Sequence, residues 1–187
     1  MKRRTALKNS AYLLGGVLSA STIAAIFESC GAPAAEGDVW TPEFLSVEEG
    51  KIVTKIADIL IPSTDTPGAV EAGVPQYVDR VAATLLGDEE KKFVKEGFKA
   101  FMAAAKEATG KSFLDASAEE QLAFLQAQEK AFVEGNEPSL FGQMKQTIYQ
   151  GFFTSEEGAT QVLMYEPVPG NYDGCIPFSE VNGTWAT

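Results

Sequence analysis

Apolar residues recur every three or four positions over most of the chain between residues 46 and 153, as the buried face of an amphipathic helix requires. The first such run follows the stretch SVEE at residues 46–49, which has the form of a capping box, and Pro62 ends it. A second helix is predicted from Pro75. A third follows Asp88 and ends at Gly110.

Two more long helices and a short last one complete the pattern. The stretch SAEE at residues 117–120 repeats the capping-box form, and Gly135 ends the helix behind it. The next amphipathic run covers 140–152, and Ser155 begins the short last helix. No window alternates β-branched residues with period two. The sequence therefore predicts an all-α domain of about five or six helices with a long irregular C-terminal tail, over residues 44–187.

The aromatic residues at helical spacing are expected to form the core of this domain, because an amphipathic helix needs such a stripe to bury. They are Phe93, Phe98, Phe101, Phe132, Phe141 and Phe152. We also expect Leu85 on the apolar face of the second helix, and Leu122 and Leu125 with Phe132 on that of the fourth.

Residues 1–29 have the pattern of an export signal. Four basic residues, Lys2, Arg3, Arg4 and Lys8, precede an uncharged, mildly apolar run over 11–27. This run is too short and too weakly hydrophobic to be typical of a permanent membrane span. A retained membrane anchor is the alternative. The paired Arg3 and Arg4, followed by Leu and Lys, are similar to a twin-arginine signal, although Lys2 and Ala6 depart from that pattern.

Cys30 follows the apolar run and begins a tether, residues 30–43. A small residue followed by cysteine resembles a bacterial lipoprotein processing site, although Phe27 and Glu28 match it poorly. Ordinary peptidase cleavage near the stretch APA at residues 32–34 is the alternative. Removal of residues 1–29 takes away four of the 15 basic and one of the 26 acidic residues. The mature chain then has a net charge of −14.

The composition limits the chemistry of the chain. Its 187 residues contain no histidine, which excludes histidine acid–base catalysis, Ser-His and Cys-His nucleophiles, and histidine metal or haem ligation. The two cysteines are far apart, and neither a G-x-G-x-x-G nor a C-x-x-C-H motif is present. A net charge of −11 argues against nucleic acid and anionic lipid as partners.

Two loops carry candidate functional residues. In the stretch PSTDTPGA at 62–69, Asp65 and the hydroxyls around it, Thr66 included, either satisfy backbone groups within turns or contact a partner. Catalysis by Asp65 is the weakest of the three interpretations, because no paired acid or base lies nearby in sequence. The second loop, 165–178, is too long for a simple connection, and turn formers flank Cys175 in it.

Four stretches carry a resemblance to a known family. These are DTPGA at 65–69, AGVP at 72–75, GFFTSEEG at 151–158 and PGNYDGC at 169–175. In content and in order they are similar to the gluconate 2-dehydrogenase subunit 3 family, over roughly residues 44–178. The resemblance implies the small, non-flavin subunit of a membrane-associated periplasmic sugar or sugar-acid dehydrogenase. In such complexes a large FAD-binding subunit oxidises the substrate, and a cytochrome or quinone accepts the electrons.

We therefore expect an accessory subunit that assists folding, twin-arginine export and anchoring of a flavoprotein, with FAD on the partner and no cofactor, metal or catalytic residue in this chain. Asp65, Thr66, Tyr172 and Asp173 are the candidate partner contacts. Cys175, an odd cysteine in an exported protein, is a candidate for a disulfide to the catalytic subunit. A buried or unreactive thiol and a functional free thiol are the alternatives.

Two other functions stay open at this point. The chain could be a free-standing envelope lipoprotein that binds a ligand or another protein. It could also be an enzyme that uses carboxylates or lysines, which the composition leaves available. A neighbouring gene for a large FAD-binding oxidoreductase would favour the accessory subunit over the lipoprotein. Turnover by the purified chain without flavin would favour the enzyme.

Overall fold

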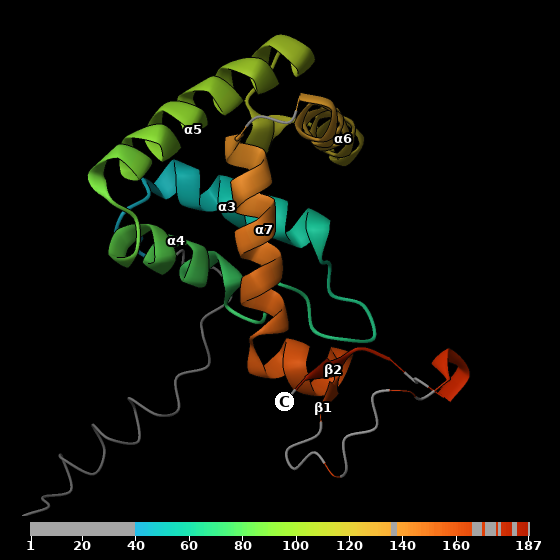
Figure 1. The fold of residues 1–187 in the computed structure, drawn as a ribbon. Helices are drawn as coiled ribbons and strands as arrows, with labels where there is room; N and C mark the ends of the chain where they lie inside the picture. Colours follow the sequence, from blue (N-terminus) through green and yellow to red (C-terminus); the bar gives the residue numbers. More distant parts are fainter. Residues whose placement is uncertain are drawn as a thin grey trace, which may run out of the picture. The chain divides into compact units, whose positions relative to one another are not determined.

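A computed structural model describes residues 40–135, 138–165, 170, 175, 177–180 and 183–186, and in these the chain is mostly helical (Figure 1). The long helices are α3 (Val47–Leu60), α4 (Val74–Thr84), α5 (Asp88–Thr109), α6 (Ala118–Gly135) and α7 (Leu140–Phe153). The short elements are η1 (Phe113–Asp115), η2 (Gly158–Val162), β1 (Met164–Tyr165), η3 (Phe178–Glu180) and β2 (Trp185–Ala186). The two strands pair in parallel, with Met164 opposite Trp185. The predicted all-α class is confirmed.

Both predicted capping boxes form. The Ser46 hydroxyl accepts the Glu49 N–H at 3.2 Å, while the Glu49 carboxylate accepts the Ser46 N–H at 2.7 Å. At the start of α6 the Glu120 carboxylate accepts the Ser117 N–H at 2.7 Å, and the Ser117 hydroxyl accepts the Glu120 N–H at 3.2 Å. Each box satisfies two of the N–H groups that a helix start leaves without an intrahelical partner. Local sequence therefore fixes where these two helices begin.

Helix α7 is the element around which the others pack. It contacts α3, α4, α5, α6 and η2, and in Figure 1 it crosses α3 and then passes α4 before the chain reaches η2. At the crossing with α4, a Cβ on Gly151 would lie 2.6 Å from the ring of Tyr77. The absence of a side chain at residue 151 thus lets the two helices approach closely.

The core contains four of the six phenylalanines expected there. Phe98, Phe101, Phe141 and Phe152 are buried, whereas the prediction was wrong for the other two: Phe93 is 37% exposed and Phe132 is 36% exposed. Helix α5 buries Val94, Phe98, Phe101 and Ala105, a stripe to which position 93 does not belong. Phe132 lies in the second half of α6, and the residues that α6 buries are all in its first half.

Two leucines assigned to apolar faces are also exposed. Leu85, at the end of α4, is 74% exposed, and Leu122 is 47% exposed. Helix α6 buries Leu125, as expected, together with Gln121 and Phe124. The buried side of α6 is determined by the connection that precedes this helix. There Phe113 in η1 packs edge-on against Phe101, with ring centroids 5.3 Å apart, and lies close to Phe124, with ring centroids 6.0 Å apart. This aromatic cluster sets the rotation of α6.

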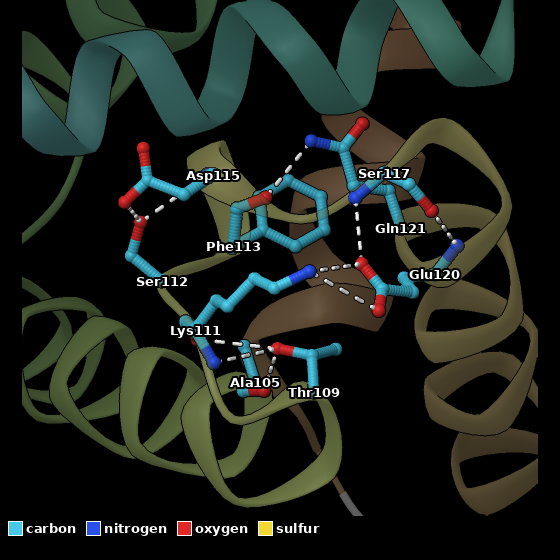
Figure 2. A network of polar contacts seen from close by, with 9 residues as sticks. All are labelled: Ala105, Thr109, Lys111, Ser112, Phe113, Asp115, Ser117, Glu120 and Gln121. Atoms are coloured by element: carbon cyan, nitrogen blue, oxygen red, sulfur yellow. Dashed lines mark hydrogen bonds and ion pairs between the residues drawn. The ribbon is translucent and has the colours of Figure 1, made fainter.

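A polar network closes the same connection between α5 and α6 (Figure 2). The buried side chain of Gln121 donates to the carbonyl of Phe113 at 2.8 Å, and Lys111 reaches the Glu120 carboxylate at 3.3 Å. The Ser112 hydroxyl, which caps η1, donates to Asp115 at 2.6 Å. The connection is therefore ordered by its own side chains rather than by the helices alone.

The chain enters the helical domain alongside α4. The carboxylate of Asp79, which is buried, accepts the backbone N–H groups of Glu43, Phe44 and Leu45 at 2.7, 3.1 and 2.8 Å. Packing begins still earlier, since the side chain of Trp40 lies close to Gly50 in α3. In the part of the chain that the structure describes, no helix combines the length and apolar character needed to span a membrane.

Candidate partner-binding surface

The loop between α3 and α4 presents Asp65 to solvent. Asp65 is exposed and its carboxylate accepts the hydroxyl of Thr64 at 3.0 Å, while Thr66 is half-buried and accepts the N–H of Thr64 through its carbonyl, also at 3.0 Å. These are turn contacts of the kind expected when polar side chains satisfy a tight backbone. They hold Asp65 and Thr66 together at the surface and leave the carboxylate accessible.

The remainder of this loop is held by hydrogen bonds between its own residues. One oxygen of Glu71 accepts both the Ser63 hydroxyl at 3.0 Å and the Gly68 N–H at 3.1 Å. The backbone folds so tightly that a Cβ on Gly68 would lie 2.6 Å from the backbone nitrogen of Ser63. The glycine of the stretch DTPGA therefore allows a close backbone approach. The loop is a preformed polar platform, which suits recognition of a partner.

The other candidates from the sequence are placed only in part. Cys175 is exposed, in agreement with the turn formers around it. Tyr172 and Asp173, the two other candidate contacts, lie outside the described residues, as do Arg3, Arg4 and Cys30. Of the predicted partner contacts, the structure describes Asp65 and Thr66, which are consecutive in the chain.

A groove that the sequence did not predict lies between the α4–α5 turn and α7. Its outer part is an open cleft of about 420 Å³, lined by Leu86, Phe93, Gln143 and Thr147 together with two glutamates, Glu89 and Glu90. Its inner part, of about 80 Å³, has Leu86, Gln143 and Thr147 in common with the cleft. The inner walls are mainly apolar and come from the core residues Leu45, Val78, Val94, Phe98, Leu140 and Met144.

Two signals in the sequence point to this groove in retrospect. Phe93 lies one position away from the apolar stripe of its helix, and two leucines, Leu85 and Leu86, follow the last residue of α4. An apolar residue beside the buried stripe is compatible with a core position or with a surface contact. Only the packing of α7 against α5 decides between the two.

The side chains that line the groove are suited to binding a partner rather than to catalysis. Its lining offers apolar surface, the side-chain amide of Gln143, the hydroxyl of Thr147 and the carboxylates of Glu89 and Glu90. Glu90 is already engaged, because its carboxylate accepts the Gly87 N–H at 2.8 Å at the start of α5. Within the described ranges, no group of three or more acidic, histidine or cysteine side chains is arranged to hold a metal ion.

Among the described residues, Glu120 has a clearly displaced pKa. The pKa of Glu120 is lowered, first because its carboxylate accepts the backbone N–H of Ser117 and then because it bonds to Lys111. These contacts are the capping box and ion pair of α6, on a connection remote in sequence from the groove and from the loop that carries Asp65. The shift therefore belongs to the helix start and marks no catalytic group.

Comparison with known proteins identifies a family. The family model described as gluconate 2-dehydrogenase subunit 3 matches residues 47–170, which runs from the first residue of α3 beyond β1. No curated protein and no solved structure matches the chain significantly. The matched range includes the loop with Asp65 and all residues that line the outer cleft.

Proposed function

Because the chain belongs to the gluconate 2-dehydrogenase subunit 3 family, we propose that it is the non-catalytic small subunit of a membrane-associated, FAD-dependent sugar or sugar-acid dehydrogenase. The observation that carries this proposal is the family match over residues 47–170, which spans the five long helices. The redox chemistry belongs to a large partner subunit that binds FAD. This chain assists the folding, export and anchoring of that partner.

The residues of the chain support this division of work. The sequence contains no Gly-rich dinucleotide fingerprint and no haem attachment motif, so flavin and haem are assigned to other subunits. The two surfaces described above, the platform around Asp65 and the groove beside Phe93, offer polar and apolar contacts to another protein. Electrons pass from the flavoprotein to a cytochrome or a quinone without a redox centre in this chain.

The proposal also assigns the complex to the periplasmic side of the membrane. The paired Arg3 and Arg4 direct the chain to the twin-arginine route, which carries folded proteins and a bound partner with them. Cys30 becomes the lipidated N-terminus of the mature chain. Asp65 and Thr66 contact the flavoprotein, as do Tyr172 and Asp173 from the second loop.

Affinity purification of the full chain from cell membranes tests the proposal. We expect one large FAD-binding subunit to copurify in fixed ratio, identified by mass spectrometry, and the preparation to reduce an artificial electron acceptor when a sugar or sugar acid is added. After dissociation, the flavin absorbance should stay with the large subunit. Purification of the chain without any flavoprotein, or turnover by the isolated chain, would contradict the proposal.

A further inference from the structure

The groove between the α4–α5 turn and α7 has the form of a receptor for a single apolar side chain. The inner pocket of about 80 Å³ is well above the roughly 15 Å³ that one water molecule needs, and its walls are mainly apolar. Water in such a pocket finds few hydrogen-bond partners, so its replacement by an apolar group is favourable. The outer cleft, about 420 Å³ in volume, leaves room for the backbone that carries this group.

The mouth of the groove is negative. Asp88, Glu89 and Glu90 form the first turn of α5, and among the described residues no lysine or arginine lines either part of the groove. The N-terminus of α5 contributes roughly half a positive charge, which is less than the charge of three carboxylates. Of the two lysines that follow, Lys92 pairs with Glu96. Lys91 donates to the carbonyl of Ala83 and keeps its charge, but neither lysine lines the groove. A basic group is the electrostatic complement of this rim.

Exposed apolar side chains enlarge the surface around the mouth. Phe93 lines the cleft although it is 37% exposed, and Leu85, the neighbour of Leu86 in the α4–α5 turn, is 74% exposed. Aromatic residues at the centre of an interface, surrounded by polar residues that exclude water, are where binding energy concentrates. Gln143, Gln146 and Thr147 on α7 provide such a polar border.

We propose that this groove is the docking site for one segment of the dehydrogenase subunit, which inserts an aliphatic side chain of at most leucine size into the inner pocket and places a lysine or arginine against Glu89. The inference rests on the proposed function for the identity of the partner. It adds the surface, the anchor and the charge of the segment that is recognised. Phe93 and Glu89 are the specificity-determining residues.

The test uses the full chain, copurified with its dehydrogenase subunit from membranes, with a photoreactive amino acid in place of Gln146. Gln146 is exposed and lines the cleft, while Gln126, an exposed glutamine on α6, is the matched control position. We expect light to crosslink the dehydrogenase subunit to position 146 and not to position 126. Mass spectrometry of the crosslinked peptide should find an aliphatic residue of at most leucine size within a few positions of a lysine or arginine.

Two pairs of substitutions measure the contribution of the groove. Glu89→Lys is compared with Glu119→Lys, since both reverse a charge at the second residue of a helix, and Phe93→Ser with Leu122→Ser, since both change a partly exposed apolar residue. Each groove variant should weaken binding of the dehydrogenase subunit about tenfold, and each control should leave it within about twofold. Circular dichroism confirms that the variants compared are folded.

The outcomes separate the two proposals. If the unsubstituted chain copurifies with no flavoprotein, the proposed function fails and this inference with it. If the flavoprotein binds, but crosslinks equally from positions 126 and 146 and tolerates the groove variants as well as the controls, the docking site is overturned and the proposed function stands. A crosslink from position 146 to a second copy of this chain would overturn it as well.

Discussion

Asp79 shows how one residue decides where the chain enters its domain. Its side chain is 2% exposed in the structure, and its carboxylate accepts three backbone N–H groups, those of Glu43, Phe44 and Leu45. A buried carboxylate is tolerated only where hydrogen bonds replace water. This role could not be predicted from the sequence, because the three N–H groups lie about 35 positions before Asp79 in the chain.

Replacing Asp79 should therefore destabilise the domain more than the loss of one hydrogen bond would. Asp79→Ala leaves three N–H groups without their acceptor, and we expect the free energy of unfolding to fall by about 3 kcal/mol. Asp79→Asn keeps one acceptor oxygen and should cost less. The control Asp58→Asn, at a half-exposed site paired with Lys55, should cost about 0.5 kcal/mol or less. Urea unfolding measures all three, and equal costs for Asp79→Ala and the control would contradict the prediction.

Gly158 shows that a residue of a family motif can be required by the backbone alone. It ends the stretch GFFTSEEG and begins η2, where a Cβ would clash with the carbonyl oxygen of Phe152. Because that oxygen belongs to the backbone, the clash cannot be relieved by a side-chain rotation. This glycine thus accounts for part of the motif without any catalytic role.

Gly158→Ala should reduce the free energy of unfolding by about 2 kcal/mol or more. Gly135→Ala is the matched control, because a Cβ there meets nothing within 4 Å and alanine favours the helix that Gly135 ends. That control should be neutral or stabilising by up to about 1 kcal/mol. Equal stability of the two variants in urea unfolding would show that η2 rearranges without cost.

At the scale of elements, the sequence predicted helix positions well and helix rotations less well. The starts of α3 and α6 follow from SVEE and SAEE, and the end of α5 from Gly110, which takes a left-handed conformation with φ of 75°. These signals are local, so the sequence contains them completely. Which side of α6 is buried depends on Phe113, a residue of another element, and the spacing of apolar residues within α6 did not reveal it.

One part of the candidate site could be predicted from the sequence and the other could not. The platform around Asp65 was predicted, because hydroxyls, glycine and proline crowd into one short loop. The groove was not predicted, because it needs Leu86 and Phe93 to meet Gln143 and Thr147, about 50 positions later in the chain. Side chains brought together by tertiary packing leave no spacing pattern in the sequence.

The capping box of α6 makes a prediction about pH. The pKa of Glu120 is lowered in the folded protein, so its stabilising contribution is complete above the pKa of the unfolded state and is lost as the pH falls through the folded value. Glu120→Gln removes this titration. The melting temperature of the unsubstituted protein should therefore exceed that of Glu120→Gln near pH 7, and the gap should narrow on acidification to below the usual glutamate range.

Glu119→Gln is the control for this prediction, since it removes the same charge one position earlier in the same helical turn. Near pH 7 its melting temperature should fall less than that of Glu120→Gln, because the capping-box bonds and the ion pair with Lys111 are made by Glu120. A constant gap between the unsubstituted protein and Glu120→Gln from pH 7 to pH values of about 3 would show that ionised Glu120 contributes nothing to the start of α6.

At the scale of the whole molecule, the proposed lipid anchor explains how an acidic domain is kept at a membrane. The net charge of −14 expected after processing repels anionic lipid, and the acyl chains proposed on Cys30 would supply the attachment. Cys30→Ala should leave uncleaved precursor or release the protein to the soluble fraction, as fractionation and blotting would detect. Mass spectrometry of the mature protein tests the same point directly, and an unmodified N-terminus at Ala35 would refute lipidation.

If the proposed export route is correct, the location of the whole complex depends on Arg3 and Arg4. Lysine keeps the charge of Arg3 and Arg4 but lacks the guanidinium group, so the double substitution Arg3→Lys with Arg4→Lys separates charge from the paired pattern. We expect this variant to leave both the precursor and its flavoprotein partner in the cytoplasm, because the partner is carried across with the small subunit.

The control is Lys2→Arg with Lys8→Arg, which keeps the arginine pair and the same charge and should export both proteins normally. Immunoblots of cytoplasmic and periplasmic fractions, with the dehydrogenase activity of each, measure the distribution. Normal export of the double lysine variant would assign the chain to the general secretory route, through which the flavoprotein could not travel folded.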